Sequence, residues 1–194
     1  LIFELINARS DLFKLNDAIS EAIYTGLITD TGSFRFSSVT PRTHEIAAYL
    51  IDKGLHHSRV HELIFDNNTE NRIRLTSYAM LEKLVVKDEY KTAYVSLTLD
   101  EQARFSAKKG DTEGLVNKAL ALQGVQMAVF FKEADGLIKI SFRSSGTIPV
   151  NDIARNHFGG GGHKNASGGK HVGSITEAIE KFVTILPKFV EENK

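Results

Sequence analysis

The sequence lacks cysteine and tryptophan and has only three prolines among its 194 residues. Without cysteine, the chain can form neither a disulfide bond nor a thiolate metal site. This fits a reducing compartment, and we expect a cytoplasmic protein. No apolar run reaches the roughly 18 residues that a transmembrane helix needs, so no membrane contact is expected. The 24 basic and 24 acidic residues cancel, so no overall positive charge indicates binding of long DNA.

The composition is otherwise that of an ordinary soluble globular chain, with 42% hydrophobic and 25% charged residues. The length suits one or two domains with a sizeable core. The first residues, LIFELINA, already follow helical spacing and do not resemble a signal peptide. We therefore expect a fragment whose N-terminal part is missing.

The spacing of apolar residues changes from helical to alternating near residue 85, and we predict an α/β protein. Pro187 should kink or end the last predicted helix. The predicted helices span residues 1–8, 18–27, 41–53, 57–65, 69–84, 100–107, 112–122, 151–157 and 174–190, and the predicted strands span 94–99, 125–131, 138–142 and 168–172.

The most unusual stretch is FGGGGHKNASGG at residues 158–169. Glycine has no Cβ, so such a backbone can lie directly against a ligand, and its successive N–H groups can form a concave anion site. A flexible glycine linker is the alternative, although the run is not padded with serine and predicted elements flank it. The candidate phosphate-binding residues are Gly159, Gly160, Gly161, Gly162 and His163.

The sequence RSSG directly follows the predicted strand 138–142. Arg143 can hold a phosphate through two parallel hydrogen bonds, and Ser144 can add a short one. The alternative is an exposed loop arginine paired with a surface carboxylate. We favour phosphate binding, because the glycine run follows in the same domain and loops at the end of a sheet commonly converge.

Asp30 lies among small hydroxyl residues in GLITDTGSFRF, at residues 26–36. It is either a metal ligand or a turn and capping residue, and local spacing alone favours the second interpretation. His57 and His61 have the i, i+4 spacing that places two imidazoles on one helix face. No third ligand is evident, so a solvated helix face is the favoured interpretation there.

Two of these stretches resemble a known family. Residues 26–36 resemble the last metal-binding motif of the DHH phosphoesterase superfamily, and FRSS with residues 151–169 resembles the DHH-associated C-terminal domain. The combination is most similar to the nanoRNase type, which comprises bifunctional oligoribonucleases and 3′-phosphoadenosine-5′-phosphate phosphatases. DTEGLVN, at residues 111–117, is similar to the same type.

The resemblance implies three parts: the C-terminal part of a DHH catalytic domain at residues 1–54, a helical linker at 55–84, and a mixed-sheet α/β substrate-binding domain at 85–194. It also implies a cofactor of two manganese ions, for which Asp30 is the single ligand that carries over. The Asp-His-His motif is missing from the sequence. The catalytic residues are therefore not identified, and this chain by itself is expected to be inactive.

The implied activity is two-metal hydrolysis of short oligoribonucleotides, and of 3′-phosphoadenosine-5′-phosphate. The implied partners are such RNAs or nucleotides, together with a second copy in a homodimer. The glycine run, Arg143 and Ser144 would hold the terminal phosphate or nucleotide, with Asn117 and Arg35 as further contacts. A cyclic-dinucleotide phosphodiesterase and a non-catalytic RNA-binding module remain as alternatives.

Overall fold

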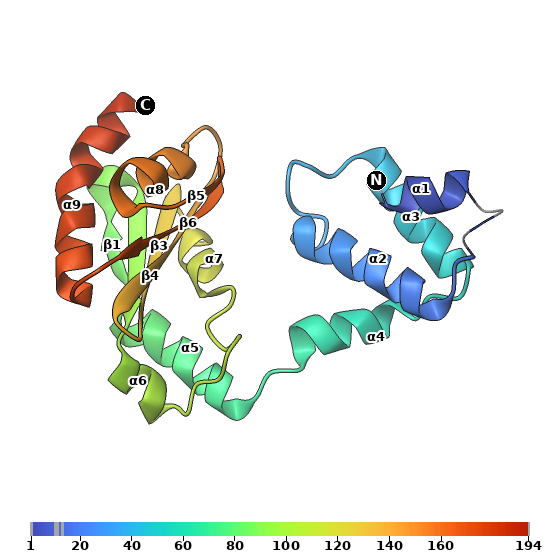
Figure 1. The fold of residues 1–194 in the computed structure, drawn as a ribbon, viewed down its shortest axis with the longest axis horizontal. Helices are drawn as coiled ribbons and strands as arrows, with labels where there is room; N and C mark the ends of the chain where they lie inside the picture. Colours follow the sequence, from blue (N-terminus) through green and yellow to red (C-terminus); the bar gives the residue numbers. More distant parts are fainter. Residues whose placement is uncertain (1, 10–11, 13, 194) are drawn as a thin grey trace. The chain divides into compact units, whose positions relative to one another are not determined.

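The computed structural model describes residues 2–9, 12 and 14–193. The chain folds as two compact units, residues 1–68 and residues 69–194 (Figure 1). Each unit has a hydrophobic core of its own. None of the described helices is both long enough and apolar enough to cross a membrane.

The first unit is helical. Polar side chains fix where two of its helices begin: Asn16 accepts a hydrogen bond from the backbone N–H of Ile19, and Thr40 forms a reciprocal capping box with Thr43. Its core gathers around Ile28 and Leu50, which are fully buried. The described helices are α1 (Ile2–Ala8), α2 (Asp17–Asp30), α3 (Pro41–Asp52), α4 (His57–His61) and the π-helical turn η1 (Glu62–Asp66).

The second unit is a six-stranded mixed sheet with helices on both faces. Its strand order is β1-β2-β3-β4-β6-β5, and all neighbours are antiparallel except the parallel pair β2 and β3. The strands are β1 (Val85–Lys87), β2 (Thr92–Leu97), β3 (Met127–Ala134), β4 (Leu137–Ser144), β5 (Gly161–His163) and β6 (Ala166–His171). The helices are α5 (Glu70–Glu82), the 3₁₀ turn η2 (Asp88–Tyr90), α6 (Leu99–Arg104), α7 (Leu115–Leu120), α8 (Val150–Phe158) and α9 (Ile175–Glu192).

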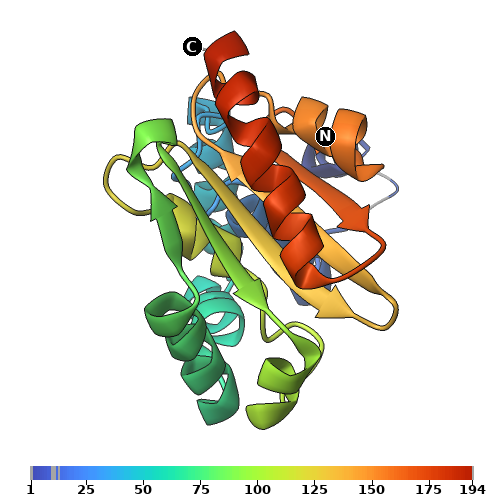
Figure 2. The same cartoon turned by 90° about the vertical axis from the view of Figure 1, so that its left-hand side faces the viewer.

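The two faces of the sheet pack against different helices. One face contributes alternate residues of β3 and β4, such as Phe131 and Phe142, to a core shared with α8 and α9. The opposite face of β2 and β3 packs under α5 and α7 through residues such as Val95 and Phe130. Figures 1 and 2 show α9 lying across one face and α7 on the other.

The predicted α/β class is confirmed, and a two-residue turn at 135–136 joins β3 to β4. Pro187 does not end its helix, and two further local predictions were wrong. Helix α9 continues through Pro187 to Glu192, because the neighbouring Leu186 and Phe189 are buried and hold the helix against the sheet. Helix α7 spans only six residues, after turns that end at Gly114. The glycine run is not all loop, because Gly161–His163 forms strand β5.

Candidate anion-binding face

The sheet face opposite α8 and α9 carries five basic residues on β3, β4, β5 and β6. Residues paired in register lie on the same face, so the pairing defines three cross-strand rows. The first row is Ala128, Arg143, Ala166 and His163; the second is Phe130, Ser141, Gly168 and Gly161; the third is Lys132, Lys139 and Lys170. We call Arg143, His163 and the three lysines, together with Ser141, Gly168 and Gly161 between them, the cationic face.

Arg143 is a half-buried cation. Its Nη1 donates to the carbonyl oxygen of Phe142 at 2.9 Å, and among the described residues no carboxylate forms an ion pair with it. Burial lowers the pKa of Arg143, and the charge of Glu113 opposes this shift. A guanidinium withdrawn from water without a carboxylate gains most from an added anion, so Arg143 is suited to bind a phosphate.

His163 ends β5 and is exposed. Its register partner Ala166 lies between it and Arg143 in the first row. A tight turn through Lys164 and Asn165 joins β5 to β6. The imidazole of His163 is thus carried by a two-stranded hairpin on the same face as the Arg143 guanidinium.

Several glycines of the run are required by neighbouring backbone. A Cβ on Gly160 would lie 2.6 Å from the Cα of Gly169, and one on Gly162 would lie 2.7 Å from the carbonyl oxygen of Ala166. Gly159 has φ +55° where α8 ends, a conformation that glycine adopts without strain. Gly161 differs, because a Cβ there would meet no atom within 4 Å. Its bare backbone is therefore open to a ligand.

Ser144 is buried and its hydroxyl is engaged within the protein. It donates to the carbonyl oxygen of Ile148 at 2.7 Å and accepts from Nδ2 of Asn165 at 2.9 Å. Asn165 also reaches the carbonyl oxygen of Gly146. Ser144 therefore ties the loop after β4 to the hairpin turn, and the exposed hydroxyl of this motif is that of Ser145.

Asn117 and Arg35 lie on different units. Asn117 is exposed on α7, the helix that contacts β3 and β4. Arg35 belongs to the first unit, is exposed, and donates from Nε to the carbonyl oxygen of Gly32 at 2.7 Å. Only Asn117 thus lies in the same unit as the cationic face.

Asp30 is the last residue of α2 and is exposed. The turn that follows is tightly built: Thr31 accepts a hydrogen bond from the N–H of Phe34 at 3.0 Å, and Ser33 and Phe34 both have positive φ. Within the described part of the chain, no three acidic or histidine side chains come together to hold a metal. A single carboxylate does not satisfy a hard divalent cation, so these residues alone do not fit a manganese centre.

The two helical histidines, His57 and His61, lie beside Tyr24. The Tyr24 hydroxyl and Nε2 of His61 are 3.2 Å apart, and the rings of Tyr24 and His57 meet edge to face. Neither imidazole takes part in a metal cluster of described residues. His57 is exposed, whereas His61 is partly buried against Tyr24, so the solvated helix face expected from the sequence describes His57 but not His61.

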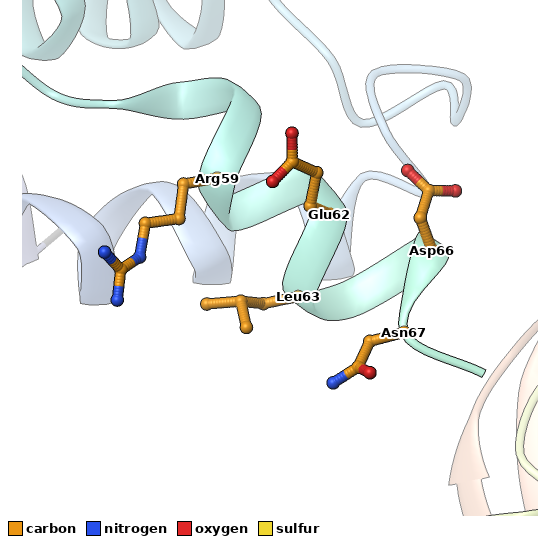
Figure 3. A pocket seen from close by; sticks show the side chains of 5 residues that line it. All are labelled: Arg59, Glu62, Leu63, Asp66 and Asn67. Atoms are coloured by element: carbon orange, nitrogen blue, oxygen red, sulfur yellow. The ribbon is translucent and has the colours of Figure 1, made fainter. Parts of the chain in front are cut away.

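Two surface pockets are lined by residues outside the cationic face. One of about 470 Å³ lies on α4 and η1, where the side chains in Figure 3 line it: Arg59, Glu62, Leu63, Asp66 and Asn67. Another of about 510 Å³ lies between α8 and α9. Neither contains a residue singled out from the sequence, so they add nothing to the anion site.

Sequence reasoning missed Ser141 and the three lysines of the face. The alternation of exposed and buried residues along β4, where Lys139, Ser141 and Arg143 alternate with Ile140 and Phe142, was the available signal. Placing Lys132 and Lys170 beside Lys139 needs the strand register, which one sequence does not provide.

Residues 88–192 match the DHHA1 domain, and the chain belongs to that family. The DHH-associated domain inferred from FRSS and the glycine run is thereby confirmed.

Particular relatives carry more specific names. The chain is 31% identical to the bifunctional oligoribonuclease and PAP phosphatase NrnA of Bacillus subtilis, over 87% of this chain and 52% of that protein. It is 28% identical to the cyclic-di-AMP phosphodiesterase PdeA of Listeria monocytogenes, over 97% of this chain and 28% of that protein.

A solved structure, an exopolyphosphatase-related protein of Bacteroides fragilis, matches with a TM-score of 0.87 at 38% identity, over 91% of this chain and 52% of that one. The chain spans about half the length of the first curated relatives it matches.

Proposed function

We propose that the protein is part of a phosphoesterase that hydrolyses short oligoribonucleotides, and that its second unit binds the terminal phosphate of the substrate. The observation that carries this proposal is Arg143, a half-buried cation with no ion-pair partner among the described residues, on the strand beside the glycine hairpin of β5 and β6. The name of the Bacillus subtilis relative supports the choice of substrate.

The residues in and around the cationic face have different roles in binding the substrate. Arg143 supplies charge and paired N–H donors to the phosphate oxygens. His163 adds a donor from the same row. Gly161 leaves room for the substrate to approach the sheet. Ser144 acts indirectly, because its two hydrogen bonds position the loop that follows Arg143 and the turn before β6.

Asp30 is the one described residue to which this proposal gives a role in manganese binding. Its exposed carboxylate has no hydrogen-bond or ion-pair partner among the described residues, so it is free to act as one ligand, and the remaining ligands must be residues other than those described. When bound, a divalent ion would supply Lewis-acid activation of a phosphoester. The described residues contribute substrate binding.

The test is calorimetric titration of the chain with 5′-phosphorylated diadenylate. Arg143→Ala should weaken binding by about ten-fold to about 150-fold, because charge-assisted hydrogen bonds contribute roughly 1.5–3 kcal/mol. Arg155→Ala is the matched control: Arg155 lies on α8, is mostly exposed, and has only a loose contact of 3.8 Å with Asp152. Equal affinity of Arg143→Ala and the unchanged chain would refute phosphate binding at Arg143.

A cyclic-dinucleotide phosphodiesterase is the second candidate, because the relative from Listeria monocytogenes aligns with nearly the whole chain. A parallel titration with cyclic di-AMP separates the two. The proposal predicts tighter binding of the linear dinucleotide, whose terminal phosphate carries more negative charge. Tighter binding of the cyclic compound would favour the second candidate.

A further inference from the structure

Three lysines lie side by side across the sheet. Lys139 pairs with Lys132 on one side and with Lys170 on the other. Like charges placed directly opposite each other on neighbouring strands destabilise a sheet. Among the described residues, none of the three ammonium groups forms an ion pair with a carboxylate. The row therefore carries a charge repulsion that the described residues do not cancel by direct pairing.

Protection of a sheet edge does not explain this row. Lysines on edge strands prevent edge-to-edge pairing, and Lys170 lies where β6 extends past the short β5. Lys132 and Lys139, however, belong to β3 and β4, which have partners on both sides. Two of the three lysines thus need another reason.

Lys132 is held in place within the row. Its Nζ lies 3.1 Å from Oγ1 of Thr112, in the segment before α7. Burial and the charge of Lys139 lower the pKa of Lys132, while the charges of Glu113 and Asp111 oppose the shift. Lys139 and Lys170 are exposed, so two ammonium groups remain available to a ligand beside the fixed one.

A nearly bare strip separates the lysine row from Arg143. The row between them carries Ser141, Gly168 and Gly161 on β4, β6 and β5. Lys139 and Arg143 are four residues apart on one strand, which corresponds to about 13 Å between their Cα atoms. Side chains stand roughly perpendicular to a sheet, so the two cationic groups are spaced to suit two separate anionic groups.

We propose that Lys132, Lys139 and Lys170 form a second phosphate subsite, which holds an internal phosphodiester of a single-stranded oligonucleotide whose end is bound at Arg143. This inference rests on the proposed function. The substrate lies along β4 over the strip of serine and glycine, and the lysine row adds affinity only for chains long enough to reach it. The face thereby favours oligonucleotides of three or more residues over a dinucleotide.

The test compares the affinity of the chain for 5′-phosphorylated adenylates of two and five nucleotides, measured at several salt concentrations. The double variant Lys139→Ala/Lys170→Ala should weaken binding of the pentanucleotide about ten-fold and change that of the dinucleotide less than about two-fold. The salt dependence for the pentanucleotide should fall by about 1.4 in log–log slope, because each of the two lysines removed accounts for about 0.7 through its interaction with a phosphate.

Lys188→Ala is the matched control, since Lys188 is 82% exposed on α9, which packs on the opposite face. Lys139→Arg, which keeps the charge, should retain most of the affinity.

The possible outcomes test the lysine subsite and the proposed function separately. Unchanged affinity of the double variant for the pentanucleotide, or an equal loss for both lengths, would overturn the lysine subsite. The proposed function would then stand if Arg143→Ala still weakened binding of the dinucleotide. Absence of binding by the unchanged chain to either RNA would overturn both.

Discussion

Replacing Gly160 by alanine tests whether the glycine run is built for packing or only for a ligand. The added Cβ would lie 2.6 Å from the Cα of Gly169 and closer still to the carbonyl oxygen of Gly168, whereas ordinary contact begins at about 3.4 Å. Gly160 is held from the other side, because its N–H donates to the carbonyl oxygen of Ala154 in α8 at 3.0 Å. The clash must therefore move β6 or break this hydrogen bond.

The expected cost follows from those two routes. Forced overpacking costs about 1–3 kcal/mol, and the loss of a backbone hydrogen bond adds about 1 kcal/mol. We expect Gly160→Ala to lower the free energy of unfolding of the second unit by about 2–4 kcal/mol. For a unit of this size that corresponds to a fall in Tm of roughly 10 °C.

Thermal unfolding followed by circular dichroism, with urea denaturation alongside, measures this effect. Gly161→Ala is the control from the same run, because its Cβ would meet no atom within 4 Å. It should change stability by less than about 1 kcal/mol, in the stabilising direction. If Gly160→Ala unfolds at the temperature of the unchanged chain, the packing argument is wrong and the run serves ligand approach alone.

Two further predictions concern carboxylates. Burial raises the pKa of Glu101, but hydrogen bonds from Lys83, the Thr98 N–H and the Tyr78 hydroxyl bring this pKa below its ordinary value. The ionised carboxylate therefore stabilises the fold at pH values above its unfolded-state pKa. This stabilisation is lost as the pH falls through the folded-state pKa. Urea denaturation should therefore show the unchanged chain losing more stability between about pH 6 and about pH 3 than Glu101→Gln does, and equal losses would contradict the role given to this carboxylate. Asp30→Asn should leave the Tm of this chain unchanged, because the side chain is exposed at the end of α2. In the full-length protein the same substitution should abolish manganese-dependent hydrolysis of the diadenylate, and retained turnover there would contradict a metal role for Asp30.

The sequence predicted those parts of the fold that local chemistry controls. The helices predicted at residues 18–27 and 41–53 begin within a residue of those ranges, because the side chains of Asn16 and Thr40 satisfy backbone N–H groups a few residues away. Strand β5 was missed, since glycine has little intrinsic preference for strands and pairs here only because β6 lies beside it. Pro187 does not end α9, because packing of its neighbours overrides the local penalty.

In the candidate site, too, the residues recognised from the sequence were those within local motifs. Arg143 and His163 were recognised because an unusual motif surrounds each of them. Ser144 was assigned to phosphate binding, but its hydroxyl is engaged by Ile148 and Asn165, and no sequence pattern signals such a contact. The lysine row could not be predicted from the sequence, because three lysines distant along the chain become neighbours only through strand register.

The two-residue turn between β3 and β4 has a consequence for the order of folding. These strands pair over eight residues each across a minimal loop, whereas the parallel pairing of β2 with β3 must wait for closure of residues 98–126. Short loops cost less entropy to close, and local contacts form faster. The hairpin that carries Lys132, Lys139 and Arg143 should therefore acquire protection from hydrogen exchange before β2 does. Most of the phosphate-binding charge would then be assembled early, by the most local pairing in the sheet.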